Sequence, residues 1–179
     1  MSDSAEHIFR QGVCEGLAKL DSQIEGVLRS LVSHEYPPEV FALSFEVFSD
    51  GFTSGFPVRA FFMDRSNTEH FLREGEQAKY PSPVDPGLLE IDHVYAKELE
   101  EELEENSLES DSWGIATEEL IQWFARHWQR VGGANFPLVA TIATHDSSEE
   151  FNLKSGGWQP SYAEFNASQE TPSQVADLP

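Results

Sequence analysis

Basic residues are scarce in this chain: eleven lysines and arginines stand against 32 aspartates and glutamates, which gives a net charge of −21 over 179 residues. So few cations cannot neutralise a row of phosphates, which argues against nucleic acid and anionic membranes as partners and favours a cationic one. About half of the excess lies in residues 90–119, where twelve acidic residues accompany a single base, Lys97. This stretch is the first candidate for a binding surface.

Cysteine is almost absent, since Cys14 is the only one, so no disulfide can form within the chain. Every apolar run is shorter than the roughly 20 residues that a membrane span needs. The first residues, MSDSAEHIF, lack the basic and apolar segments of a secretory signal. These absences predict a cytoplasmic protein, and 39% hydrophobic residues are enough to build a folded core.

Motifs of catalysis and cofactor binding are missing as well. The chain has no HExxH or CxxC pair for a metal, no G-x-S-x-G nucleophile turn, and no glycine-rich loop followed by the lysine of a phosphate site. We therefore predict no catalytic residue, no metal and no cofactor. A protein that acts by binding is favoured over an enzyme, and the enzyme reading stays open.

The apolar pattern predicts a helix and a β-hairpin in the first half of the chain. Apolar residues at steps of three and four indicate one long helix over residues 4–32. Residues 40–48 and 57–64 alternate apolar and polar side chains around a turn-forming segment, which predicts two antiparallel strands. Residues 67–77 are expected to form a short helix.

The second half is predicted to hold two helices and two strands. An Asp-Pro start and an apolar stripe indicate a helix over residues 86–106, with a strand over 88–94 as the alternative. A helix over residues 117–131 begins at a capping threonine and ends at a Gly-Gly pair. Residues 137–144 and 151–153 are expected to be strands.

This order of elements predicts one α+β domain over residues 1–159, with an antiparallel sheet and helices mainly on one face. Trp158 is expected to complete its core. Residues 160–179 are polar and without periodicity, so we expect a disordered tail. The alternative is that Tyr162 and Phe165 dock on the body as a short turn.

Four glutamates of the acidic stretch share one side of the predicted helix. Like charges at this spacing repel by about 0.2–0.5 kcal/mol per pair, so a cluster kept at that cost is a candidate docking surface for a basic protein. A merely solvated helix face is the equally weighted alternative. The docking residues and the two acids at their edges are Glu98, Glu101, Glu102 and Glu105, with Asp92 and Glu109.

A second candidate site is His145-Asp146, at the end of a predicted strand. A histidine there is placed to act as a base or to hold a ligand, with His93 as a possible companion. The same residues are also ordinary turn formers. Cys14 falls within a turn of an apolar stripe and is expected to be an inert buried thiol. His127, flanked by aromatic residues, is expected to take part in helix packing or to lie at its polar edge.

The segment IQWFARHWQRVGGANFPLVATIATHDSSEEFNLKSGGW resembles a pattern in uncharacterised bacterial proteins: an aromatic helix ending in Gly-Gly, a Phe-Pro strand, His-Asp, and a Phe-x-Leu strand. The resemblance covers roughly residues 115–158 and implies a bacterial origin and a small α+β domain, but no activity. In general character the chain is similar to bacterial immunity proteins, which neutralise toxins by binding. We therefore expect an immunity-type inhibitor of a basic toxin, with DNA mimicry ranked lower because it needs two rows of acids.

Overall fold

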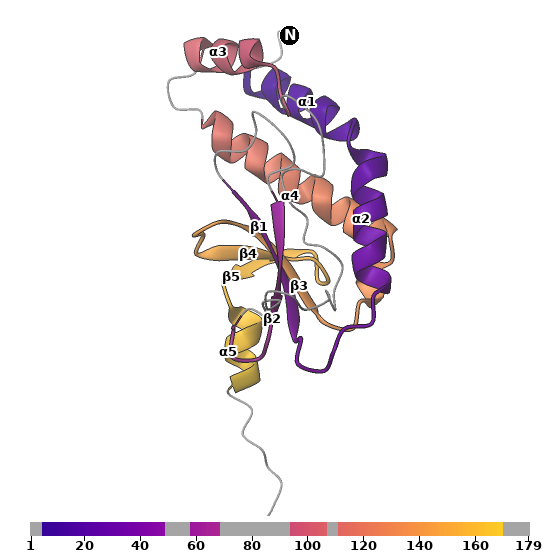
Figure 1. Ribbon diagram of the computed structural model, residues 1–179. Helices are drawn as coiled ribbons and strands as arrows, with labels where there is room; N and C mark the ends of the chain where they lie inside the picture. The colour runs from indigo at the N-terminus through magenta and orange to yellow at the C-terminus, as the bar shows by residue number, and fades with distance from the viewer. Residues whose placement is uncertain (1–4, 49–57, 69–93, 107–110, 170–179) are drawn as a thin grey trace, which may run out of the picture.

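A computed structural model describes residues 5–48, 58–68, 94–106 and 111–169, which form an α+β fold (Figure 1). One five-stranded sheet has the order β2-β1-β3-β4-β5. Its strands are β1 (Ala42–Val47), β2 (Val58–Met63), β3 (Val139–Thr144), β4 (Glu149–Asn152) and β5 (Gly157–Pro160). The helices in these ranges are α1 (Ala5–Ala18), α2 (Asp21–Ser33), α3 (Lys97–Asn106), α4 (Ser112–Arg130), the 3₁₀ helix η2 (Gly133–Asn135) and α5 (Ala163–Gln169).

The sheet is mixed, although most of its pairs are antiparallel. The predicted hairpin is confirmed by antiparallel pairing of β1 with β2. The unexpected pair is β1 with β3, which run parallel with Phe45 opposite Ile142. The amide of His145 donates to the carbonyl of Val47 at 2.9 Å and extends this ladder. The carboxyl ends of β1 and β3 therefore meet at one edge of the sheet.

The single helix expected over residues 4–32 is wrong, because the chain turns between α1 and α2. The amides of Lys19 and Leu20 donate to carbonyls three residues earlier, at 3.2 and 2.8 Å, and this tight turn ends α1. The apolar stripe continues across the break, since Leu17, Leu20 and Ile24 are all buried. Periodicity alone therefore could not reveal the turn.

The helix predicted to begin at Thr117 begins at Ser112 instead. The Asp111 side chain accepts a hydrogen bond from the amide of Gly114 at 3.0 Å and caps the helix. The predicted end is confirmed: α4 stops at Arg130, and Gly132 adopts a left-handed φ of 97°.

The acidic helix is shorter than predicted. α3 begins at Lys97, and residues 94–96 form a bend rather than helix. The rest of the expected start, residues 86–93, lies outside the described residues, as does most of the alternative strand over 88–94 and of the expected helix over 67–77. Within α3 the apolar side is confirmed, because Leu103 is fully buried.

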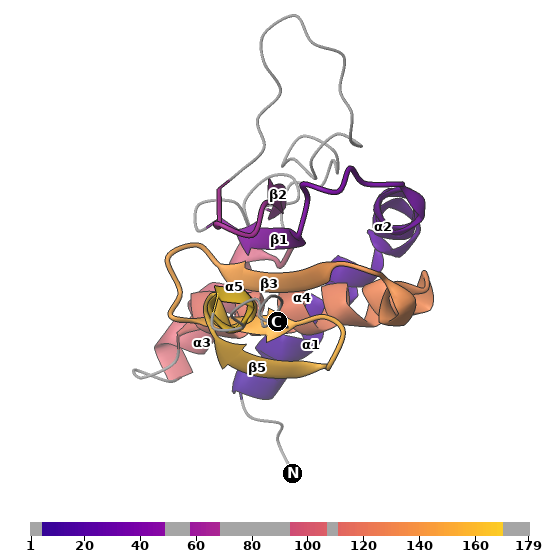
Figure 2. The ribbon, with the colours of Figure 1, turned by 90° about the horizontal axis from the view of Figure 1, so that it is seen from below.

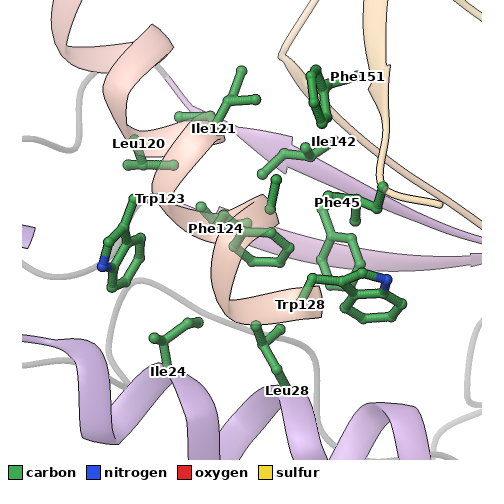
Figure 3. Close-up of a cluster of buried hydrophobic side chains, with 14 of the residues drawn as sticks. Ile24, Leu28, Phe45, Leu120, Ile121, Trp123, Phe124, Trp128, Ile142 and Phe151 are labelled. Atoms are coloured by element: carbon green, nitrogen blue, oxygen red, sulfur yellow. The ribbon is translucent and has the colours of Figure 1, made fainter. Parts of the chain in front are cut away.

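The core lies around α4, between the sheet and the α1–α2 pair (Figures 1 and 3). The Phe45 ring of β1 packs against Phe124 and Trp128 of α4, with ring centroids 4.8 and 5.6 Å apart. On the other side of α4, Ile24 and Leu28 of α2 are fully buried. Side chains alternate along a strand, so the neighbours of Phe45 in β1 point to the opposite face of the sheet.

The tail expected over residues 160–179 is wrong for residues 160–169. Pro160 belongs to β5, and α5 follows it, with Phe165 only 4% exposed and its ring 5.3 Å from that of Phe41. Asn152 donates to Glu164 at 3.0 Å and fixes α5 on the sheet face opposite α4 (Figure 2). The docking alternative holds for Phe165, and residues 170–179 lie outside the described residues.

Replacing Phe165 with alanine should destabilise the whole fold, because a buried ring that joins α5 to the sheet is lost. We expect a cost of about 3 kcal/mol and a melting temperature lower by roughly 6–12 °C in thermal unfolding. Asn166→Ala, on the exposed side of the same helix, is the control. Equal melting temperatures for wild type and Phe165→Ala would show that α5 does not contribute to the core.

Two glycines of the N-terminal helices should respond in opposite directions to alanine. A Cβ at Gly16 would lie 1.6 Å from the backbone oxygen of Val94, so Gly16→Ala forces α1 away from the chain leading into α3, at a cost of about 1–3 kcal/mol. A Cβ at Gly26 meets nothing within 4 Å, so Gly26→Ala should stabilise by about 0.4–1 kcal/mol. Chemical denaturation of the two variants measures both signs, and a destabilised Gly26→Ala would contradict this account of the pair.

Candidate functional site

The exposed glutamates of α3 form the surface that we call the acidic surface: Glu98, Glu101, Glu102, Glu104 and Glu105. In Figure 1 the helix lies at one end of the molecule, beside the start of α1. Lys97 pairs with Glu101 at 2.9 Å, and it is the only cation within the described ranges that makes an ion pair with these five side chains. Among the described residues, the negative charge of this surface is therefore almost unopposed.

The acidic surface is seated on α1 and on the start of α4. Leu103 is buried beneath the acidic surface. Leu99 packs closely against Gly12 of α1, where a larger residue would collide with it. Glu100 faces inward and accepts hydrogen bonds from the Tyr95 hydroxyl at 3.2 Å and from the Ser112 hydroxyl at 3.1 Å. Burial and the Glu100 charge raise the pKa of Tyr95 to about 12, so the phenol stays a donor. Glu100 thus holds α3 in place.

A second group of acids surrounds Arg10 at the contact of α1 with α4. Its guanidinium pairs with Glu6 at 3.1 Å and with Glu118 and Glu119, each at 2.9 Å. The hydrogen bonds to Glu119 and Glu118 raise the pKa of Arg10, and three carboxylates around one cation leave the group negative. This end of the molecule is therefore acidic beyond α3 itself.

Cys14 lies beside the same group and corrects the expectation of a buried thiol. It is exposed, and its sulfur is 3.4 Å from a carboxylate oxygen of Glu119. Partial burial of the sulfur and the hydrogen bond to Glu119 raise the pKa of the thiol. A raised pKa disfavours the nucleophilic thiolate. The chemical inertness of Cys14 stays a prediction, and burial in the core is not its cause.

Three residues of the two predicted sites cannot be placed. Asp92 and Glu109, the expected edges of the acidic surface, lie outside the described residues, and so does His93, the expected companion of His145. The four central glutamates of the prediction are brought together on α3. Asp111, Glu118 and Glu119 carry the acidic stretch on to α4.

The His145 region forms a concave site on the sheet face opposite α4, which we call the sheet-face pocket. It has a volume of about 120 Å³ and lies where the carboxyl ends of the parallel strands β1 and β3 meet. Its polar lining comes from both strands, from the turn into β4 and β4 itself, and from the turn that precedes α5. The lining residues with side chains able to bond to a ligand are Ser44, Glu46, Thr141, Thr144, His145, Asp146, Ser147, Glu150, Ser161 and Tyr162.

A histidine–carboxylate pair lies in this pocket. His145 Nδ1 lies 2.7 Å from Oε2 of Glu46, and the Phe48 ring stacks on the imidazole at 4.7 Å. The hydrogen bond to Glu46 raises the pKa of His145, and the charge of Asp146 adds to the effect. A carboxylate bonded to one ring nitrogen fixes the tautomer and leaves the other nitrogen available for proton transfer or for a ligand.

The sequence identified His145 and missed its partner. Glu46 occupies a polar position of the strand predicted over residues 40–48. That polarity is the sequence signal from which it could have been found. Only the parallel pairing of β1 with β3 brings it next to His145. The other described histidine considered above, His127, lies elsewhere, in the contact of α2 with α4.

His127 is buried in a helix contact, the first of the two placements that the sequence left open, and it has polar partners there. Its Nδ1 lies 3.1 Å from Glu25 and its Nε2 lies 3.0 Å from Asp21, both on α2. Trp123 of α4 donates its indole N–H to the same Asp21 oxygen at 2.7 Å. These bonds satisfy polar groups inside a helix contact, which assigns His127 to the architecture rather than to a ligand site.

A third concave region lies between the first half of α4 and the strands β3 and β5; we call it the tryptophan pocket. Its volume is about 300 Å³. Trp158, expected to complete the core, is instead 48% exposed and lines this pocket. The lining residues are Asp111, Trp113, Gly114, Thr117, Glu118, Ile121, Thr144 and Trp158.

Two further features bear on what the molecule could bind. In the described ranges no three histidine, cysteine, aspartate or glutamate side chains are arranged to hold a metal ion. The same ranges contain no helix with the length and apolar character that a bilayer span requires.

The midpoint of His145 titration should lie above the ordinary value of 6.5. Because folding raises this pKa, the stabilisation from the His145–Glu46 pair is full below pH 6.5 and is lost as the pH rises through the folded value. Glu46→Gln should lower the midpoint, and Asp146→Asn should lower it less, since the Asp146 carboxylate is 3.6 Å away and 89% exposed. NMR titration of the imidazole C–H signals measures the midpoint in the wild type and in both variants. A midpoint unchanged by Glu46→Gln would show that the pair does not form in solution.

Comparison with known proteins gives no relative: no family model matches the chain, and no curated protein or solved structure matches it at a significant level.

Proposed function

We propose that this protein is a non-enzymatic binding protein whose acidic surface docks a basic protein partner. The observation that carries the proposal is the set of five exposed glutamates on α3, with one lysine paired to them within the described ranges. A helix that served only solubility would be more stable with lysines interspersed, because neighbouring glutamates repel. The cluster is therefore better explained by a cationic counterpart.

Charge of this kind acts mainly on association. A negative patch raises the rate of encounter with a positive partner and orients the approach, and salt screens the effect over about 8–10 Å. The carboxylates around Arg10 extend the field beyond α3 toward α4. We therefore expect a partner with a basic face and a binding rate that falls steeply with ionic strength.

The finer form of the proposal is an immunity-type inhibitor that neutralises a basic toxin by binding to it. The small α+β fold, the strong acidity and the general likeness to bacterial immunity proteins support it. A toxin gene beside this gene, or rescue of cells that express that toxin, would identify the partner. Metabolic genes in the same neighbourhood would count against it.

Reversing Glu98, Glu101, Glu102 and Glu105 to lysine should lower the association rate with the partner by about tenfold or more at low salt, because electrostatic steering is lost. Surface plasmon resonance across a range of ionic strengths measures the rate, after the partner is captured from the native host at low salt. A second variant serves as the matched control. It reverses to lysine four exposed acids outside the acidic surface: Glu15, Glu35, Glu39 and Glu149.

The control changes the net charge by the same amount and leaves the acidic surface intact. A local docking surface predicts a much larger loss for the α3 variant than for the control. Equal losses would mean that only total charge matters. Unchanged binding of the α3 variant would refute docking through α3.

A second candidate function is a small enzyme or ligand-binding protein that uses the sheet-face pocket. The Glu46–His145 pair in a concave, polar site is the observation that favours it. Small polar compounds that shift the His145 signals of the wild type but not those of Glu46→Gln would support this function. If no compound shifts them, the pair has no ligand of this class.

A further inference from the structure

We infer that the tryptophan pocket receives an arginine side chain from the basic partner. The inference rests on the proposed function and deepens it, since it names the group that anchors the partner beside the acidic surface. The pocket combines three properties that suit a guanidinium: aromatic faces, negative charge and an unpaired hydroxyl.

The aromatic and acidic groups come first. Trp113 and Trp158 both line the pocket, and Trp158 is 48% exposed, so part of its indole surface is open to a ligand. Asp111 and Glu118 add two carboxylates, and the described residues of the lining include no lysine, arginine or histidine. One oxygen of Asp111 caps α4 and one oxygen of Glu118 is held by Arg10, which leaves the second oxygen of each as an acceptor.

The hydroxyl of Thr117 is the independent observation. Thr117 is 4% exposed and lines the pocket, and its Oγ1 has no hydrogen-bond partner among the described residues. Buried hydroxyls without a partner are rare, because desolvation costs about 1–3 kcal/mol when no bond replaces water. Threonine in a helix has a second favourable rotamer, so rotation of the side chain can turn Oγ1 toward a donor that enters the pocket, and a guanidinium carries five donors.

The pocket adjoins the acidic surface through the start of α4. Ser112, between the lining residues Asp111 and Trp113, donates to Glu100 of α3 at 3.1 Å. A partner drawn to the acidic surface therefore meets the tryptophan pocket at the neighbouring helix start. Charge complementarity thus continues from one feature to the other.

Arginine fits this lining better than a neutral side chain does. Its planar cation stacks on indole and also donates to carboxylates and hydroxyls. A neutral apolar side chain would desolvate the acceptors without bonding to them. Arginine and tryptophan are also the residues most often found at the energetic centres of protein interfaces.

The experiment uses the full chain and two probes of nearly equal shape, N-acetyl-arginine methylamide and N-acetyl-citrulline methylamide, which differ in charge. The indole N–H signals of Trp113 and Trp158 are followed by NMR at low salt. We expect saturable shifts with the arginine probe and about tenfold weaker binding of the citrulline probe, the ratio expected from losing the cation–aromatic and ionic contacts. Equal binding of the two probes would overturn the inference.

Two variants test the pocket itself. Trp158→Ala and Glu118→Gln should each weaken arginine binding about threefold or more, whereas Glu35→Gln, an equal charge change at an exposed position after α2, should alter it less than twofold. Glu118→Gln and Glu35→Gln still decide the result if Trp158→Ala does not fold. If these two glutamate changes weaken binding equally, the probe responds only to total charge, and the inference of an arginine pocket is refuted.

The same variants separate this inference from the proposed function. If the partner needs the α3 glutamates but is unaffected by Trp158→Ala and Glu118→Gln, the pocket inference fails and docking stands. If the arginine probe binds as expected and partner binding survives reversal of the α3 glutamates, docking through the acidic surface fails and the pocket stands.

Discussion

The rest of the described structure depends on the burial of α4 on several sides at once. Ten of its residues are buried, against the sheet on one side and against α1 and α2 on the other. Phe124 and Trp128 meet Phe45 of β1, which ties the helix to the central pair of parallel strands. Buried polar side chains on such a helix need internal partners. α2 supplies Asp21 and Glu25 for His127, whereas Thr117 Oγ1 and Trp128 Nε1 have no partner among the described residues.

Because so much of α4 is buried, the side chains that could bind a ligand lie at the edges of the core. Most of the middle of α4 is buried, whereas its first turns carry Asp111, Trp113 and Glu118 at the tryptophan pocket. The sheet is covered by α4 on one face and only in part by α5 on the other, where Glu46 and His145 meet. Both pockets therefore lie where an element of the core ends, and both reach Thr144 at the end of β3.

The parts of the fold that local signals encode could be predicted from the sequence. The β1–β2 hairpin and the stop of α4 at Gly132 are of this kind, since turn residues and a left-handed glycine act within a few positions. The parallel pairing of β1 with β3 joins residues about a hundred positions apart in the sequence. No local pattern predicts such a pair. For the same reason composition identified the glutamates of α3 and a strand end identified His145, whereas Glu46 and the tryptophan pocket required the tertiary structure.

Steering and anchoring make opposite demands on a binding surface, and the proposed function divides them between neighbouring elements. Exposed carboxylates act at a distance but contribute little in contact, because water competes for both charges. Anchoring requires groups withdrawn from water, where stacking and hydrogen bonds keep most of their strength. The acidic surface meets the first demand and the tryptophan pocket meets the second. The Ser112–Glu100 hydrogen bond fixes the two relative to each other, so in such a complex salt would change mainly the association rate, and the pocket would govern how long the partner stays.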